Sequence, residues 1–79
     1  MIPPRIEKVE ILEDYMIQLI YDNGERKVYD MKPNLEKKPF RKLRDYNLFK
    51  NVKAAGETIE WETGEDISPE DLYINSKPI

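Results

Sequence analysis

The sequence predicts a small α+β domain in which a meander of three antiparallel strands and a second hairpin form a small sheet, with two or three short helices on one face. Three observations favour this class. Short runs rich in Val, Ile and Tyr fill the first third of the chain, an Asn-Gly pair separates two of them, and the apolar spacing lengthens from two to about three and a half residues after residue 33. A chain of 79 residues suits one such domain, residues 1–79.

The central hairpin is expected at residues 16–31. Residues 16–21 are apolar at five of six positions and suit a pleated surface. A two-residue Asn-Gly turn would place Leu19 opposite Val28, whereas a three-residue turn with a bulge at Gly24 would shift the pairing by one residue. We expect the first register, because it pairs apolar residues across the ladder.

The other two strands of the meander flank this hairpin. Arg5–Leu12 is expected to be a half-buried strand, because apolar and charged residues alternate along it. Glu13 and Asp14 would then turn the chain into the central strand. The third strand, Arg26–Asp30, is expected to end before Pro33, which has no N–H to donate to a ladder.

Two short helical pieces are expected between residues 34 and 51. Pro39 suits the start of the first piece, and Phe40 and Leu43 lie one turn apart on its apolar side. Asp45 has the position of an N-cap for the second piece. The apolar stripe of both pieces would lie on the sheet.

The last third of the chain is expected to form a hairpin, a turn and a helix. Lys53–Ala55 and Thr58–Trp61 would pair across a glycine turn. Ser68 has the position of an N-cap, and the Pro after it suits the first position of a helix at Pro69–Tyr73. Residues 75–79 are expected to be a flexible tail.

The composition bounds the chemistry that the chain can perform. The chain has no Cys and no His, so it lacks a thiol nucleophile, the commonest general base and the commonest metal ligand. Its three glycines are isolated, and neither of its serines has a His to activate it. We therefore expect no enzyme activity, no cofactor and no metal site.

Location and charge give further limits. No apolar run approaches the roughly 20 residues of a membrane-spanning helix, and the start does not resemble a signal peptide. With the absence of Cys, this favours a soluble protein of the cytoplasm without a membrane partner. The net charge of −3 hides a division: residues 34–53 hold seven basic and two acidic residues, whereas 54–79 hold one basic and seven acidic residues.

The basic residues of the middle third are the first candidate site, a surface for a protein partner or a nucleic acid. They are Lys37, Lys38, Arg41, Lys42 and Arg44, followed by Lys50 and Lys53. Such a cluster can attract phosphates or an acidic protein surface, and it can equally be the solvated face of an amphipathic helix. The pI near 5.0 argues against a general nucleic-acid binder.

The acidic residues of the last third invite a metal site. They are Glu57, Glu60, Glu62, Glu65, Asp66, Glu70 and Asp71. Their spacing matches no calcium-binding loop. An electrostatic match with the basic residues, within the molecule or between copies, explains them at least as well.

Trp61 is the only Trp and has two interpretations. It can cover the edge of the core beneath the last helix, touching Leu72 or Tyr73, which is the interpretation we favour. It can also be an exposed anchor for a partner, because Trp and Tyr often dominate such interfaces. For the second reason Trp61 is included among the candidate surface residues.

Several runs of residues carry a resemblance to a known family. They are Tyr21-Asp22-Asn23-Gly24-Glu25, Tyr29-Asp30-Met31-Lys32-Pro33, the spaced Phe40, Leu43, Asp45, Phe49 and Val52, and the ending Thr58-Ile59-Glu60-Trp61, Gly64, Asp66-Ile67-Ser68-Pro69-Glu70-Asp71-Leu72-Tyr73. With these residues the chain resembles, over nearly its whole length, the bacterial family called domain of unknown function 2442. The Gly-x-Asp-Ile-Ser-Pro run with the Trp before it is the most specific part, and Glu62 replaces the Pro expected after that Trp.

The resemblance implies a small α+β domain, found alone or fused to a helix-turn-helix, with no established catalytic residues. It also implies a gene beside that of another short uncharacterised protein, in pairs interpreted as toxin and antitoxin. We therefore expect a non-enzymatic protein-interaction module, antitoxin-like or regulatory, whose partner is the neighbouring-gene product or a second copy. The alternative is a nucleic-acid-binding accessory protein that uses residues 37–53.

Overall fold

The computed structural model describes residues 2–79 and contains six strands and four short helices within them. The strands are β1 (Ile6–Ile11), β2 (Met16–Tyr21), β3 (Arg26–Asp30), β4 (Val52–Ala55), β5 (Thr58–Trp61) and β6 (Lys77–Pro78). The helices are the 3₁₀ helices η1 (Lys32–Glu36) and η2 (Lys38–Arg44) and the α-helices α1 (Tyr46–Phe49) and α2 (Pro69–Asn75). The expected meander, second hairpin and short helices are confirmed.

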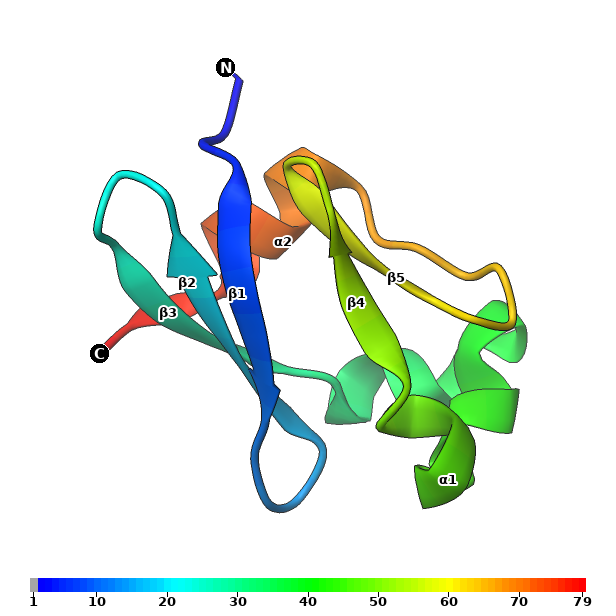
Figure 1. Cartoon of the computed structure of the whole chain (residues 1–79). Coiled ribbons are helices and arrows are strands. Elements are labelled where there is room, and N and C mark those ends of the chain that lie inside the picture. Colours follow the sequence, from blue (N-terminus) through cyan, green and yellow to red (C-terminus); the bar gives the residue numbers. More distant parts are fainter. Residues whose placement is uncertain (1) are drawn as a thin grey trace.

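The strands form two sheets (Figure 1). In the first sheet β1, β2, β3 and β6 are antiparallel neighbours in that order, and in the second β4 pairs with β5. The β4–β5 hairpin lies beside β1, where the N–H of Ile6 donates to the carbonyl of Gly56 at 2.9 Å. Helices η1, η2 and α1 connect β3 of the first sheet to β4 of the second, and α1 lies at the N-terminal end of β4.

The preferred register of the central hairpin is wrong. Leu19 lies opposite Lys27, one residue from the expected Val28. The N–H of Tyr21 donates to the carbonyl of Glu25 at 2.9 Å, so the loop has three residues and ends at Gly24 with φ of +92°. This is the bulged turn that was the alternative. The shifted register is favoured because it turns Tyr29 of β3 toward the core, whereas Val28 lies half-buried on the other face of the sheet.

The same turn recurs after β5. The N–H of Trp61 donates to the carbonyl of Glu65 at 2.8 Å, and the N–H of Gly64 donates back to the carbonyl of Trp61 at 2.9 Å. Gly64 also has a positive φ, of +101°. Residues 21–25 and 61–65 share an aromatic residue at the start and Gly-Glu at the end, so one local sequence pattern gives one turn geometry twice.

Helices η1, η2 and α1 together form the helical segment, residues 32–49, and its structure agrees with the capping and apolar signals of the sequence. Asp45 caps α1, because its carboxylate accepts the N–H of Asn47 at 3.0 Å. Pro39 lies in the first turn of η2, as expected. Leu43 and Phe49 are fully buried, which confirms the expected apolar side of the segment.

The C-terminal part differs from expectation in three ways. Helix α2 extends to Asn75, and Ser68 stands at its N-cap position but makes no side-chain cap hydrogen bond. The expected tail, residues 75–79, instead supplies the short strand β6, and the N–H of Ile79 donates to the carbonyl of Arg26 at 3.1 Å. Strand β6 forms because the outer edge of β3 offers backbone groups that need partners.

One core joins both sheets and the helices. Its buried apolar residues are Ile6, Ile17, Leu19, Tyr21, Tyr29, Met31, Leu35, Leu43, Phe49, Ile59, Trp61, Ile67 and Leu72. Helix α2 touches both sheets, because Leu72 is in this core and the ring of Tyr73 makes an edge contact with that of Tyr21, with centroids 5.2 Å apart. Within residues 2–79, no helix has the length and hydropathy required to cross a bilayer.

Candidate functional site

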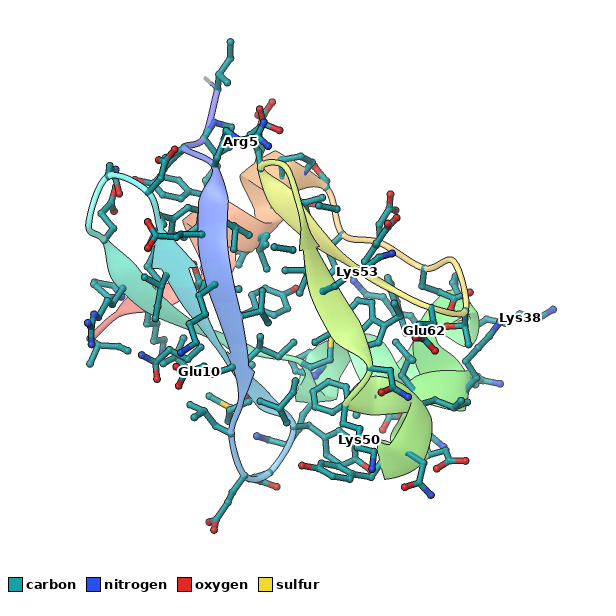
Figure 2. The ribbon with its side chains drawn as sticks, viewed as in Figure 1. Arg5, Glu10, Lys38, Lys50, Lys53 and Glu62 are labelled. Carbon is teal, nitrogen blue, oxygen red and sulfur yellow. The ribbon has the colours of Figure 1, made fainter. Side chains whose placement is uncertain are left out.

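The basic residues of η2 form an exposed row. A 3₁₀ helix has three residues per turn, so side chains at every third position lie in line. Lys38, Arg41 and Arg44 have this spacing and are exposed; we call them the basic row. Figure 2 shows Lys38 projecting away from the helical segment. The apolar residues Phe40 and Leu43 occupy a different line of the same helix, which explains why the row stays in solvent.

Internal contacts use some of these cations. Arg44 donates through Nη2 to Glu36 at 2.9 Å and through Nε to the carbonyl of Leu35 at 3.1 Å. Lys42 pairs with Glu65 at 3.1 Å. Within residues 2–79 no ion pair is made by Lys37, Lys38 or Arg41, which therefore remain available to a ligand.

The basic and acidic thirds of the chain are matched within the molecule. Besides the Lys42–Glu65 pair, Lys53 approaches Glu60 to 3.8 Å across the β4–β5 hairpin. The expected electrostatic match is therefore present between the two segments. Among residues 2–79, no group of three or more acidic side chains is arranged to hold a metal ion.

Trp61 lies in the core and cannot act as an exposed anchor. Only 1% of it is accessible, and its indole N–H donates to the carbonyl of Phe49 at 2.8 Å. The rings of Phe49 and Phe40 lie 6.2 and 6.3 Å from it, centroid to centroid. Trp61 thus packs against the helical segment, and it must be removed from the candidate surface because the β4–β5 hairpin turns it inward.

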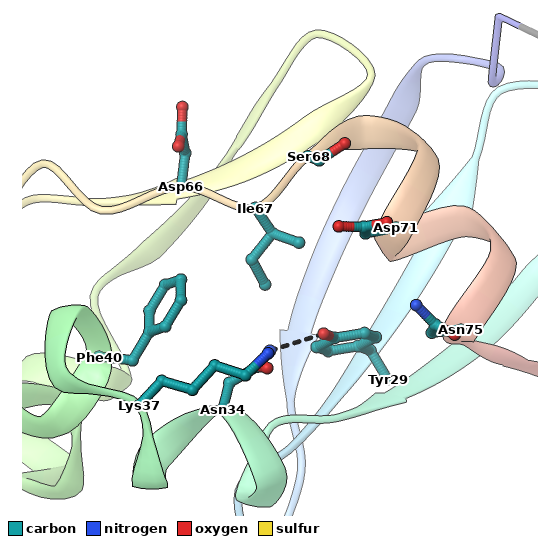
Figure 3. Close-up of a pocket in the computed structure, with 9 residues that line it drawn as sticks. All are labelled: Tyr29, Asn34, Lys37, Phe40, Asp66, Ile67, Ser68, Asp71 and Asn75. Atoms are coloured by element: carbon teal, nitrogen blue, oxygen red, sulfur yellow. Dashed lines mark hydrogen bonds between the residues drawn. The ribbon is translucent and has the colours of Figure 1, made fainter.

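A groove between the helical segment and α2 was not anticipated from the sequence. The groove has two parts. The first, lined by more residues, has a volume of about 280 Å³, and the second has a volume of about 310 Å³. Both parts are lined by Tyr29, Asn34 and Asn75. The remaining lining residues of the first part are Lys37, Phe40, Asp66, Ile67, Ser68 and Asp71. Figure 3 shows residues of the helical segment on one side and residues of α2 and its preceding loop on the other. Hollows of this size approach those that hold small ligands, about 300 Å³ and more.

The floor of the groove holds two buried polar residues. The Nδ2 of Asn34 donates to the hydroxyl of Tyr29 at 2.6 Å, and both residues are less than 10% exposed. Burial raises the pKa of Tyr29, the hydrogen bond from Asn34 opposes this, and the charge of Asp71 adds to it. Within residues 2–79, nothing accepts the proton of the Tyr29 hydroxyl and nothing donates to Oδ1 of Asn34, so each has a hydrogen bond to offer.

The two sides of the groove carry opposite charges. Lys37 extends over the groove from the junction of η1 and η2, and Asp71 and Asn75 face it from α2 (Figure 3). These three side chains make no hydrogen bond or ion pair with any of residues 2–79. The carboxylate of Asp66 points away from the groove. The groove therefore presents one unpaired carboxylate on a helix and one unpaired ammonium on a long side chain.

The sequence contained a partial signal for the groove. Two of the runs that carry the family resemblance, residues 29–33 and 66–73, supply most of its lining. They lie more than thirty positions apart, so only the packed structure shows that they meet. The basic row adjoins the groove through Lys37, which follows η1 and precedes η2.

The fold and the groove define a small α+β domain in which a four-stranded antiparallel sheet and a separate hairpin share one core. The profile of the family described as "Protein of unknown function (DUF2442)" matches residues 6–78. The chain therefore belongs to this family. No curated protein and no solved structure matches the chain significantly.

Proposed function

We propose that the chain is a non-enzymatic protein-interaction module, the antitoxin-like or regulatory member of a two-gene pair. Its partner binds the face formed by the groove and the basic row. One observation carries this proposal: polar side chains without a partner in residues 2–79 come from two segments far apart in the sequence, residues 37–41 and helix α2, which meet at the groove through Lys37, Asp71 and Asn75. These side chains are Lys37, Lys38, Arg41, Asp71 and Asn75.

The physical reason is the cost and gain of binding at such a face. Solvated charges of both signs gain little within the monomer, but opposite charges on a partner can steer association and fix its orientation. The groove beside the basic row adds concave surface with Phe40 and Ile67 in its lining, where apolar contact can accompany the polar contacts. A domain with a small core also gains stability when a partner covers more of its surface.

The test is co-purification with the product of the neighbouring gene. The full chain and that protein are co-expressed, and the mass of the complex is measured by size-exclusion chromatography with light scattering. We expect a complex of fixed stoichiometry. The double variant Lys38→Glu/Arg41→Glu should raise its dissociation constant at least tenfold.

The matched control is Arg5→Glu/Arg26→Glu, which changes the net charge equally at exposed positions outside the groove and the basic row. It should leave the dissociation constant within twofold. Absence of a complex, or equal weakening by both double variants, would refute the proposed binding face.

Nucleic acid is the second candidate partner, because a straight row of cations also suits phosphates. Binding to duplex DNA would then fall steeply between about 50 and 200 mM salt, through counterion release. Fluorescence anisotropy with a labelled duplex separates the two functions. A salt-sensitive affinity that Lys38→Glu/Arg41→Glu abolishes would replace the protein-interaction function with a nucleic-acid one.

A further inference from the structure

The groove offers acceptors where a cation would lie. The carboxylate of Asp71 faces it from α2 and has no partner in the described residues, and Oδ1 of Asn34 lies at its floor without a donor. Asn34 is 8% exposed and its Nδ2 is held by Tyr29, whereas Oδ1 has no donor among residues 2–79 and is still reached by solvent, so it can accept a hydrogen bond from a group that enters the groove. A carboxylate together with an amide oxygen that is free to accept suits an ammonium or a guanidinium group.

The walls suit the stem of a long basic side chain. Phe40 and the buried Tyr29 place aromatic rings in the lining, and Ile67 adds an aliphatic side chain. Lysine and arginine combine an apolar stem with a charged end, and both are attracted to aromatic faces. Tyr29 also has a hydroxyl proton to donate, which can bind a backbone carbonyl of the same guest.

We infer that the groove takes a basic side chain, an arginine or a lysine in an exposed segment of the protein partner, and holds it against Asp71. This inference rests on the proposed function and names the partner's contact within the same face. Lys37 is the internal competitor for the position. No ion pair joins Lys37 to Asp71, and its flexible stem can move the ammonium into solvent when the guest enters.

The competition gives the test a definite sign. If the guest is a cation, Asp71→Asn removes the attraction and weakens binding, whereas Lys37→Met removes a repulsion and strengthens it. If the guest is an anion, both signs reverse. Both substitutions preserve the approximate size of the side chain, and Lys37 is exposed, so neither is expected to disturb the fold.

The probes are blocked alanine pentapeptides with a central arginine, citrulline or glutamate, together with spermidine. Each is titrated into the full ¹⁵N-labelled chain, and the side-chain amide signals of Asn34 and Asn75 are followed by NMR. We expect the arginine peptide to shift both signals. The citrulline peptide should bind at least tenfold more weakly, Asp71→Asn should weaken the arginine peptide at least tenfold, and Lys37→Met should tighten it severalfold.

The control variant is Asp22→Asn, at the tip of the central hairpin, which should leave the affinity for the arginine peptide unchanged. Tighter binding of the glutamate peptide, weaker binding after Lys37→Met, or no shift of either amide signal would each overturn the inference. Spermidine binding as tightly as the arginine peptide would overturn it as well, because the groove would then select a free polyamine.

Failure of the inference is distinguishable from failure of the proposed function. In the complex with the neighbouring-gene product, a dissociation constant that Lys38→Glu/Arg41→Glu raises and Asp71→Asn leaves unchanged would sink the groove contact alone. If the peptide binds in the groove but the full chain forms no complex with the neighbouring-gene product, the proposed partner is refuted and the groove contact is supported.

Discussion

Two buried tyrosines on neighbouring strands show how one hydroxyl changes the energetics of a residue. The hydroxyl of Tyr29 accepts a hydrogen bond from Asn34, whereas that of Tyr21 has no partner in residues 2–79. Burial, with smaller contributions from the charges of Tyr73 and Glu25, raises the pKa of Tyr21 to about 12. The hydroxyl of Tyr21 is therefore desolvated in the folded state without forming a compensating hydrogen bond.

The substitution Tyr21→Phe should raise the free energy of unfolding by about 1 kcal/mol, because it removes a desolvated group that is left without a hydrogen bond. The same chemical change at Tyr29 should lower the free energy of unfolding by about 1 kcal/mol, because Nδ2 of Asn34 loses its oxygen acceptor and keeps only the weak acceptor Sδ of Met31. Urea denaturation followed by circular dichroism measures both values. A loss of stability in Tyr21→Phe would mean that an ordered water bridges this hydroxyl.

Lys27 marks a limit of prediction at this scale. A lysine on a strand is normally assigned to the solvent face, yet Lys27 is 9% exposed and lies on the core face opposite Leu19. Its stem is buried while Nζ donates to the carbonyl of Tyr73 at 2.5 Å and lies 3.8 Å from the centroid of that ring. Those acceptors belong to α2, which is distant in sequence, so no local pattern could assign Lys27 to the core.

At the scale of elements, the turn of the central hairpin is fastened to α2. The carboxylate of Glu25 accepts the hydroxyl of Tyr73 at 2.5 Å and Nδ2 of Asn23 at 2.6 Å. These hydrogen bonds, with that from Tyr73 the larger, hold the pKa of Glu25 below its ordinary value of 4.5. Glu25 is therefore a charged connection between β3 and the last helix.

This connection should make stability depend on acid. Because the pKa of Glu25 is lower in the folded state than in the unfolded chain, its contribution is present above pH 4.5 and is lost as the pH falls through the folded-state pKa. Glu25→Gln should flatten the decline of unfolding free energy in this range without abolishing it, because the pKa of Glu65 is also lowered, chiefly by hydrogen bonds from Thr63 and Lys42.

Urea titrations at several pH values between neutral pH and pH 3 would measure the effect. Tyr73→Phe removes the donor and should flatten the same part of the curve, and the double variant with Glu25→Gln should add little further flattening. Equal pH dependence in the parent chain and in Glu25→Gln would contradict the role of this hydrogen bond.

Most elements could be predicted because their signals are local. Apolar alternation predicted β1, a run of apolar residues predicted β2, and the Asn-Gly turn after it predicted the return strand β3. Asp45 marked the start of α1, and Gly56 marked the second hairpin. Strand β6 could not be predicted, because Lys77-Pro78 has no strand propensity and pairs only where β3 leaves an edge open. The hairpin register depended on which face of β3 packs against the core, and that choice is tertiary.

In the whole molecule, the two sheets are separate strand ladders that are joined by the backbone hydrogen bond from Ile6 to Gly56 and share one core. Ile17 and Leu19 come from the four-stranded sheet, Ile59 and Trp61 from the β4–β5 hairpin, and Phe49 from the helical segment that joins them. The β4–β5 hairpin depends on this shared core, because an isolated two-stranded hairpin is marginally stable in water, and it covers apolar residues of the four-stranded sheet in return. The molecule should therefore unfold as one unit.

The lone Trp makes this prediction measurable. Trp61 is in the hairpin, so its fluorescence reports the smaller sheet, whereas far-ultraviolet circular dichroism reports all strands and helices. Urea transitions by the two methods should coincide in midpoint and slope. A fluorescence midpoint at lower urea would show that the hairpin and the helical segment detach first.

The candidate site was predictable only in part, because one part of it is local in the sequence and the other forms only when the whole chain is packed. The basic row is local to one helix, so its residues could be named from the sequence. The groove needs residues 29–37 and 66–75 to face each other, and that meeting is a product of the completed core. Trp61 was ambiguous for the same reason, because its exposure depends on what covers it.

The hairpin tip has a consequence for the chemical ageing of the protein. Asn followed by Gly is especially prone to deamidation, in which the glycine nitrogen attacks the asparagine side chain and ammonia leaves. Here the N–H of Gly24 is held by the carbonyl of Tyr21 at 3.0 Å, and both ends of the Asn23 amide are held by Glu25. The five-membered intermediate cannot close until these hydrogen bonds break. The rate at which stored protein forms isoaspartate at Asn23 therefore measures, without a label, how often the hairpin tip opens.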